Sequence, residues 1–171
     1  MNQTTKYCKE SRVVKTSHVL PPDTNVHNTL FGGKLMAYVD DCASLSATRH
    51  ARCPVVTAST DSVDFLSPIG MEDSVCLESF VTWTGRTSME VFVKVIAENL
   101  MTGERRIAAT SFLTFVALDE HKKPVQVPQV IPQTEEETKL NETAATRAAW
   151  RKQRREESRS LAEFLTTNKP W

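Results

Sequence analysis

The chain has 171 residues, and its 21 Lys and Arg side chains balance its 21 Asp and Glu side chains, so the formal net charge at pH 7 is zero. This length predicts one domain with room for an appendage, and the balanced charge gives no electrostatic reason to expect nucleic acid or a membrane as partner. Because no apolar run approaches the roughly 18 residues of a membrane span and the polar N-terminus lacks a signal-peptide pattern, we expect a cytoplasmic protein.

The N-terminal part is expected to supply one strand. Residues 1–10 are polar, and we expect them to be loose. Residues 11–20 are rich in β-branched side chains, which favour a strand, and Pro21-Pro22-Asp23 ends it. A loop and a long helix follow, and the helix is predicted to run to about residue 50, before the breaker Cys53-Pro54. This helix is apolar over much of its circumference, as buried helices are.

The long helix begins at a glycine pair, Gly32-Gly33. Glycine inside a helix costs about 1 kcal/mol relative to alanine, but at a helix N-terminus it lets free backbone N–H groups approach a ligand. Asp40 lies about two turns further along the helix, and we expect its carboxylate to be buried. A polarising helix terminus and a carboxylate on one element favour chemistry on a carbonyl group.

Four strands with period-two alternation are predicted after the helix. They span residues 55–66, 74–83, 88–99 and 105–118, and short turns between them predict an antiparallel meander. A long helix beside such a sheet must be covered by it, since its apolar face would otherwise meet water. The expected fold class is therefore α+β, with an antiparallel sheet wrapped around a central helix.

The composition changes after residue 123. Pro124, Pro128 and Pro132 recur at a spacing that is incompatible with a regular helix and predicts an extended Pro-rich linker over residues 124–133. Residues 134–137 fit a helix-capping box, and a charged helix is predicted from there to about residue 165. Residues 134–171 are thus predicted to form a charged helical extension at the C-terminus.

Four short motifs stand in order along the chain. They are Asp23-Thr24-Asn25, Phe31-Gly32-Gly33 followed by Asp40, the segment 61–69, and the turn Gly85-Arg86-Thr87-Ser88. Together they resemble the hot-dog-fold acyl-CoA thioesterases of the acyl-CoA hydrolase family. The resemblance covers residues 8–123, which we take as the hot-dog domain.

The resemblance implies a fold, an assembly and a reaction. The fold is a hot dog, and two protomers would join edge to edge into a homodimer with active sites at the interface. Dimers of such proteins often assemble into hexamers, as trimers of dimers. The implied reaction hydrolyses an acyl-CoA thioester to a fatty acid and free CoA, as in fatty acid metabolism. Coenzyme A is then part of substrate and product, and no separate cofactor or metal is expected.

The resemblance also implies catalytic residues. Asp40 matches the catalytic carboxylate of the family, and it could act as a general base on water or as a nucleophile. The N–H groups of Gly32-Gly33 could stabilise the oxyanion. The polar partner of Asp40 would be Asn25 or Asn28. The chain departs from the family here, because members commonly have glycine at the position of Asn28, and some have asparagine at that of Thr29.

Residues for CoA binding are predicted at the turn. Arg86 can bind phosphate in bidentate geometry, and Thr87 and Ser88 offer hydroxyl donors; the alternative is an ordinary hairpin with an exposed arginine. The C-terminal helix adds a basic stripe, which is either a solvated charged face or a cover over the nucleotide end of CoA from a neighbouring subunit. The stripe consists of Arg147, Arg151, Arg154 and Arg155.

Two other functions are compatible with this fold. A non-catalytic acyl-CoA binding or sensing protein would bind the thioester without turnover. A dehydratase would typically pair a histidine with a carboxylate, and no histidine lies at helical spacing from Asp40.

The four cysteines lack C-x-x-C spacing, which favours small buried thiols over a zinc or redox site.

Overall fold

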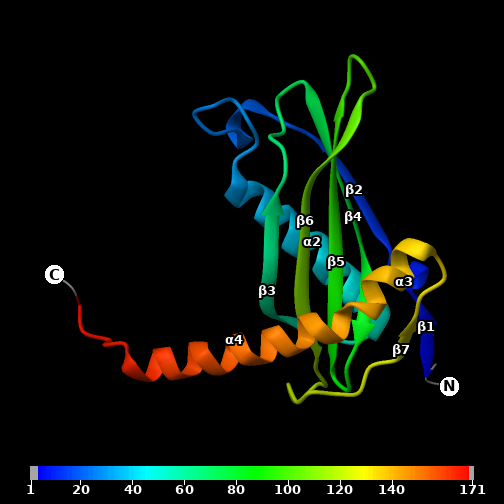
Figure 1. The fold of residues 1–171 in the computed structure, drawn as a ribbon, viewed down its shortest axis with the longest axis vertical. Helices are drawn as coiled ribbons and strands as arrows, with labels where there is room; N and C mark the ends of the chain where they lie inside the picture. The colour runs from blue at the N-terminus through cyan, green and yellow to red at the C-terminus, as the bar shows by residue number, and fades with distance from the viewer. Residues whose placement is uncertain (1–3, 170–171) are drawn as a thin grey trace.

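The computed structural model describes residues 4–169, and five strands in it form one antiparallel sheet in the order β2-β4-β5-β6-β3 (Figure 1). The strands are β2 (Val13–His18), β3 (Val55–Phe65), β4 (Asp73–Thr84), β5 (Ser88–Asn99) and β6 (Arg105–Ala117). The predicted strands, and the meander of β4, β5 and β6, are confirmed. Strand β3 lies at an edge, with β6 as its only strand partner among the described residues.

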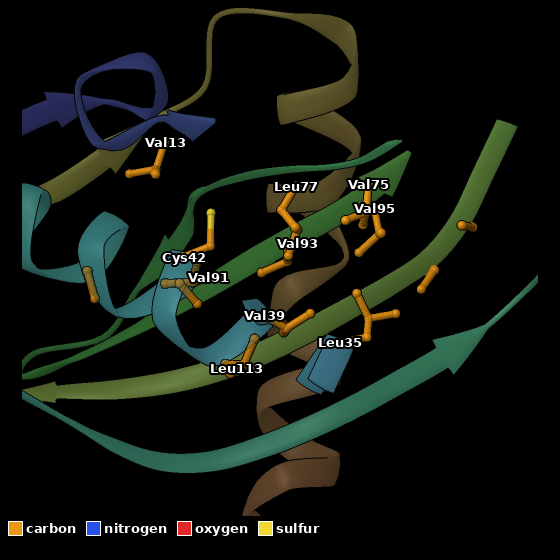
Figure 2. Close-up of a cluster of buried hydrophobic side chains, with 14 of the residues drawn as sticks. Val13, Leu35, Val39, Cys42, Val75, Leu77, Val91, Val93, Val95 and Leu113 are labelled. Atoms are coloured by element: carbon orange, nitrogen blue, oxygen red, sulfur yellow. The ribbon is translucent and has the colours of Figure 1, made fainter. Parts of the chain in front are cut away.

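Helix α2 (Gly32–Ala51) packs against one face of this sheet, and together they form the core. Figure 2 shows Leu35, Val39 and Cys42 of the helix among side chains of β4, β5 and β6. The helix ends where Arg52 takes the left-handed conformation, with a φ of 57°. An antiparallel sheet with a long helix across its face is the predicted hot-dog arrangement.

Only one side of α2 is covered in the protomer. Met36 and Leu45 are about half exposed, whereas Leu35, Val39 and Cys42 are buried. The expectation of a helix buried around much of its circumference is therefore wrong for a single chain. A five-stranded sheet covers only one face of a helix. The opposite side of α2, and the side that faces out past the edge strand β3, stay exposed.

The alternation in the strands is largely confirmed. Every second residue of β5 is buried on the face that carries α2, as period-two alternation predicts, and these residues are Met89, Val91, Val93, Val95 and Ala97. In β4, a register shift between Val81 and Trp83 changes the phase, so that Trp83 is only partly buried. Sequence alternation thus locates the sheet face, and bulges decide where a strand departs from it.

The N-terminal residues are ordered rather than loose from residue 4 onward, and the prediction for residues 1–3 lies outside the described residues. Strand β1 (Thr5–Tyr7) pairs in parallel with β7 (Gln129–Ile131), and the short helix α1 (Cys8–Ser11) follows it. A 3₁₀ turn, η1, spans Pro21–Asp23. Strands of three residues carry too little periodicity to be predicted, and the two partners are distant in sequence.

The C-terminal extension lies on the face of the sheet opposite α2. The predicted capping box is confirmed, since Glu137 N–H donates to Thr134 Oγ1 at 3.2 Å and the Glu137 carboxylate accepts from Thr134 N–H at 3.2 Å. The predicted single helix is instead two, α3 (Glu135–Glu142) and α4 (Ala144–Phe164), which meet at Thr143. Figure 1 shows α4 crossing the sheet and extending past the edge strand β3.

The packing beneath α3 is aromatic. Phe80, Phe92 and Phe112 form a cluster on this face of the sheet, and Leu140 of α3 packs against it. The extension is therefore attached to the sheet through its first half.

No helix between residues 4 and 169 has both the length and the hydropathy of a bilayer-spanning segment.

Candidate active site

The N-terminus of α2 presents two unpaired donors. The N–H groups of Gly32 and Gly33 have no hydrogen-bond acceptor within residues 4–169. A Cβ at Gly33 would lie 2.5 Å from the Phe31 ring, and one at Gly32 would lie 3.5 Å from the Phe65 ring. Glycine at position 33 therefore lets the Phe31 ring fold over the first turn. A carbonyl oxygen reaching this helix end would meet free N–H donors and the positive end of the helix dipole.

The loop before the helix is anchored to its surroundings. Leu30 N–H donates to Ile69 O and Phe31 N–H donates to Asp23 O, both at 2.8 Å. The Asp23 carboxylate also pairs with Lys34 Nζ at 3.0 Å, which connects the loop to the first turn of α2. These contacts fix the direction in which the two glycine donors point.

Asn25 organises the loop from within. Its Oδ1 accepts from His27 N–H at 2.9 Å and from Thr29 N–H at 3.3 Å, and its Nδ2 donates to Thr29 Oγ1 at 3.0 Å. Asn28 is exposed and has a φ of 58°, a left-handed conformation that glycine adopts without strain. Within the described residues of one protomer, neither asparagine bonds to Asp40.

Asp40 is exposed in the protomer, which corrects the expectation of a buried carboxylate. Its polar partner is Thr57 of β3, whose Oγ1 donates to Asp40 Oδ1 at 3.0 Å. The other carboxylate oxygen accepts no hydrogen bond from residues 4–169. Asp40 is exposed because it lies on the side of α2 that faces the edge strand, where the protomer has nothing further to cover it.

The turn between β4 and β5 is held through its backbone. Gly85 N–H donates to Ser88 O at 2.9 Å, Ala117 N–H donates to Thr87 O at 3.0 Å, and Val127 N–H donates to Arg86 O at 3.0 Å. The Arg86 side chain is exposed and has no hydrogen-bond or ion-pair partner in residues 4–169. The extended segment after residue 123 thus packs against this turn. It leaves the side chain of Arg86, which is predicted to bind phosphate, free.

The basic stripe of α4 is mostly engaged in ion pairs. Arg147 contacts the fully buried carboxylate of Glu90 at 2.7 Å. Arg151 and Arg154 both pair with Asp61 of β3, at 2.9 and 2.6 Å. The sequence offered a solvated charged face or a cover over the nucleotide end of CoA. These three residues instead attach α4 to the sheet.

Comparison with known proteins identifies the family. The model of the thioesterase superfamily matches residues 27–104. A Bacillus subtilis protein named uncharacterized acyl-CoA thioester hydrolase YkhA is 68% identical over 167 residues, which are 98% of this chain and 97% of the relative. The chain belongs to the acyl-CoA thioester hydrolase family. The resemblance found in the sequence is thereby confirmed, as is the prediction of an enzyme of this family.

Solved structures of the family share the fold. An acyl-CoA hydrolase from Bacillus cereus is 58% identical, with a TM-score of 0.93 over 95% of this chain and 99% of that one. An acyl-CoA hydrolase from Staphylococcus aureus, solved with butyryl coenzyme A, is 44% identical, with a TM-score of 0.90 over 94% of this chain and 98% of that one. A third relative, 56% identical with a TM-score of 0.86 over 88% of this chain and 97% of that one, is described as an apo-hexameric acyl-CoA thioesterase. The hot-dog fold is confirmed.

Cysteine side chains of this hydrolase family member are poor candidates for nucleophiles. Burial raises the pKa of the Cys8 thiol to about 12, with a further contribution from the Glu137 carboxylate. Burial also raises the pKa of Cys42. Both thiols therefore stay protonated near neutral pH.

Among residues 4–169, no group of three or more His, Cys, Asp or Glu side chains is placed to hold a metal ion.

Sequence analysis missed Thr57 and the role of Asp61. Thr57 pairs in register with Phe115, whose side chain is buried in the core, so both point to the face that carries α2. Period-two alternation along β6 puts Phe115 on the inner face of the sheet, and it could have located Thr57 if the strand register had been known. Asp61 had no such signal, because its partners are on α4, about 90 residues later in the chain.

Proposed function

We propose that this chain hydrolyses acyl-CoA thioesters to a fatty acid and free CoA, with Asp40 as the general base. The observation that carries the proposal is the hydrogen bond from Thr57 to Asp40 Oδ1. This bond orients the carboxylate and leaves Oδ2 to accept a proton from water. The family, and the relative solved with butyryl coenzyme A, support a CoA thioester as the substrate.

A comparison of spacings supports the same residues. Solved alanine variants of the Staphylococcus aureus hydrolase replace an asparagine, an aspartate 15 residues after it and a threonine 17 residues after the aspartate. Asn25, Asp40 and Thr57 have these two spacings in this chain. We therefore assign them to one site, in which Asn25 shapes the loop and Thr57 holds the base.

The proposed reaction uses the helix terminus as its second component. Asp40 Oδ2 takes a proton from water while the water oxygen attacks the thioester carbonyl carbon. The negative charge that develops on the carbonyl oxygen meets the N–H groups of Gly32 and Gly33, and one such donor is commonly worth about 3 kcal/mol of the barrier. The C–S bond then breaks, and the CoA thiolate leaves. The proton that Asp40 took from water passes to the thiolate, directly or through solvent, which regenerates the base.

The geometry favours a site shared by two protomers. Asp40 lies seven residues after Gly33 on one helix, which at 1.5 Å per residue is about 10 Å along the axis. A water that touches both the base and the carbonyl carbon cannot bridge that distance within one protomer. We therefore propose that the glycine donors of one protomer serve the Asp40 of its partner. The exposure of Asp40, Phe31 and Phe65 fits such an interface.

Assembly, CoA contacts and location complete the proposal. The relative described as apo-hexameric supports a homo-oligomer, and we propose a trimer of dimers. Arg86, Thr87 and Ser88 would contact the phosphates of CoA, which fits the free side chain of Arg86. Four free thiols fit the reducing cytoplasm.

Replacing the base tests the function. Asp40→Asn keeps the size and the hydrogen bond from Thr57 but cannot accept a proton, so we expect kcat for acyl-CoA hydrolysis to fall by about two orders of magnitude or more in a folded oligomer. Unchanged turnover would refute Asp40 as the base. Saturable binding of acyl-CoA by the wild-type protein, without any product, would instead indicate a non-catalytic binding protein.

A labelling experiment detects a nucleophilic Asp40 whose mixed anhydride is opened by water at the Asp40 carbonyl. After many turnovers in H₂¹⁸O, a general base leaves Asp40 unlabelled and puts ¹⁸O into the fatty acid. A mixed anhydride, opened by water at the Asp40 carbonyl, puts ¹⁸O into the Asp40 carboxylate, which mass spectrometry of the peptide detects. Label in that peptide would overturn the assignment of Asp40 as a base.

A further inference from the structure

We propose that the groove between α4 and the outer face of the sheet is a phosphate-binding site for a nucleotide. The α4 groove, as we call it, has a volume of about 370 Å³, which lies in the range of small-molecule sites. Where the phosphates are those of CoA, the inference rests on the proposed function. A free nucleoside diphosphate would present the same chemistry.

The floor of the α4 groove comes from the sheet. The hydroxyl side chains of Ser88 and Thr114 contribute to it, beside the small apolar side chains of Ala58 and Val116. Their neighbours Met89 and Phe115 are buried against α2, so alternation turns Ser88 and Thr114 to the outer face. Thr114 Oγ1 is engaged with Asp61 at 2.7 Å, whereas the Ser88 hydroxyl has no partner within residues 4–169. Ser88 also belongs to the turn that carries the exposed Arg86, so the groove begins where a CoA contact is predicted.

The wall of the groove is basic and comes from α4. It carries Arg151, Lys152, Arg154 and Arg155. Arg151 and Arg154 share the single carboxylate of Asp61, which fixes the height of the helix above the floor. Lys152 and Arg155 have no carboxylate partner in the described part of the chain. Four cations thus line the groove. Asp61 pairs with two of them and the buried Glu90 carboxylate also lies 3.5 Å from Arg151, which leaves two cations for a ligand.

This combination selects phosphate among the common ligands. A surplus of cations beside a free hydroxyl matches a group with several negative oxygens, and charge-assisted hydrogen bonds to phosphate are among the stronger ones. A fatty acyl chain would find charges where it needs an apolar lining. The basic side chains of α4 therefore have two tasks: Arg147, Arg151 and Arg154 attach the helix to the sheet, and Lys152 and Arg155 face the ligand.

The test compares two variants with the same change of charge. The first is Lys152→Gln/Arg155→Gln, and the control is Arg159→Gln/Lys169→Gln, whose residues are exposed and lie outside the groove. Isothermal titration calorimetry with free CoA and with ADP reads binding directly. We expect the first variant to bind about tenfold or more weakly, since one hydrogen bond to a charged group is worth about that factor, and we expect the control to match the wild type.

Each arm of the experiment has a distinct meaning. Weaker binding of CoA, with a matching rise in KM for acyl-CoA, supports the site with the substrate as the source of phosphate. Weaker binding of ADP with unchanged CoA binding supports it with a free nucleotide. Wild-type binding by the groove variant, or equal losses in the control, would overturn the proposal, as would a wild-type protein that binds neither probe.

The proposed function is measured separately. An acyl thioester of N-acetylcysteamine carries no phosphate, so its hydrolysis reports on Asp40 and the glycine donors alone. We expect the groove variant to hydrolyse it at the wild-type rate. A loss of that hydrolysis in the groove variant would contradict a role confined to phosphate binding, and its absence in the wild type would count against the proposed function instead.

Discussion

At the scale of single residues, Thr57 is the contact through which the sheet controls Asp40. Its hydroxyl is the only group within residues 4–169 that bonds to the carboxylate. Without that bond, an exposed aspartate would sample several rotamers. The position of the proposed base therefore depends on an edge strand, although Asp40 itself is on the helix.

Removal of the Thr57 hydroxyl should lower turnover more than binding. We expect Thr57→Val to reduce kcat by about tenfold, which corresponds to one ordinary hydrogen bond of about 1 kcal/mol or somewhat more, while KM changes little. Thr57→Ser keeps the donor and should retain most of the activity. Steady-state kinetics with one acyl-CoA decides this, and equal losses in both variants would show that packing, not the hydroxyl, matters.

His50 provides a second prediction at this scale, on stability. Its Nε2 lies 2.8 Å from Pro128 O, and because a carbonyl only accepts, Nε2 must carry the proton. Nδ1 is buried and has no hydrogen-bond partner in the described part of the chain. Burial lowers the pKa of His50, the nearby Lys6 ammonium lowers it further, and the bond to Pro128 and the Glu10 carboxylate act in the opposite direction. The folded protein thus favours the neutral imidazole.

The sign of the pH effect follows from this lowered pKa. Below the ordinary histidine pKa of about 6.5, the unfolded chain binds a proton that the folded chain does not, so the free energy of unfolding falls as pH falls. We expect urea unfolding of the wild type to lose about 1 kcal/mol more than His50→Gln between pH 7.5 and 5.5. A constant difference between the two proteins would contradict this.

At the scale of elements, α4 is attached to the sheet by charge rather than by an apolar face. Glu90 is fully buried on β5, and Arg147 contacts it with two nitrogens, at 3.1 and 2.7 Å. The Arg147 guanidinium also lies over the Phe112 ring, 4.1 Å from its centroid. A buried carboxylate that loses its cation is costly, so this contact makes the position of the helix specific.

The attachment of α4 predicts an unequal response to loss of arginine. We expect Arg147→Met to lower the free energy of unfolding by about 3 kcal/mol, because it removes the closest cation from the buried Glu90 carboxylate and leaves only Arg151, at 3.5 Å. Arg159→Met, on the exposed part of the same helix, should change it by less than about 0.5 kcal/mol. Adding Glu90→Gln to Arg147→Met should recover part of the loss. Urea denaturation measures all three, and equal costs for the two single variants would refute a specific role for this pair.

At the scale of the whole molecule, the unfinished side of the protomer is its main feature. The second carboxylate oxygen of Asp40, the glycine donors and the free edge of β3 all lack partners within residues 4–169. If Asp40 is the base, a protomer that exposes it together with Phe31 and Phe65 is an incomplete enzyme. The proposed dimer would complete it.

Mixed dimers test whether the site is shared. Asp40→Asn removes the base, and Gly33→Val places a side chain where the Phe31 ring lies, so each homodimer should be inactive. If the two components come from different protomers, one of the two sites in a mixed dimer carries neither substitution. Co-expression with two tags and tandem purification should then restore hydrolysis. A mixed dimer as inactive as its parents would place both components in one protomer.

The sequence by itself determined the parts that depend on local patterns. Alternation over long runs gave the meander and placed Met89 to Ala97 inward, the glycine pair marked the start of α2, and the capping box marked that of α3. These signals are local because they follow from backbone geometry and from burial of one face. The family also followed from short motifs in register.

Only the tertiary structure decided what depends on contacts between distant segments. The β1–β7 pair, the hold of Thr57 on Asp40 and the pairing of Asp61 with α4 join residues from 17 to more than 100 positions apart. No periodicity encodes such pairs, since strand register and helix placement are set by the packing of the whole core. For the same reason the exposure of Asp40 was invisible in the sequence, where an acid on an apolar helix looks the same whether a sheet covers it or a second protomer does.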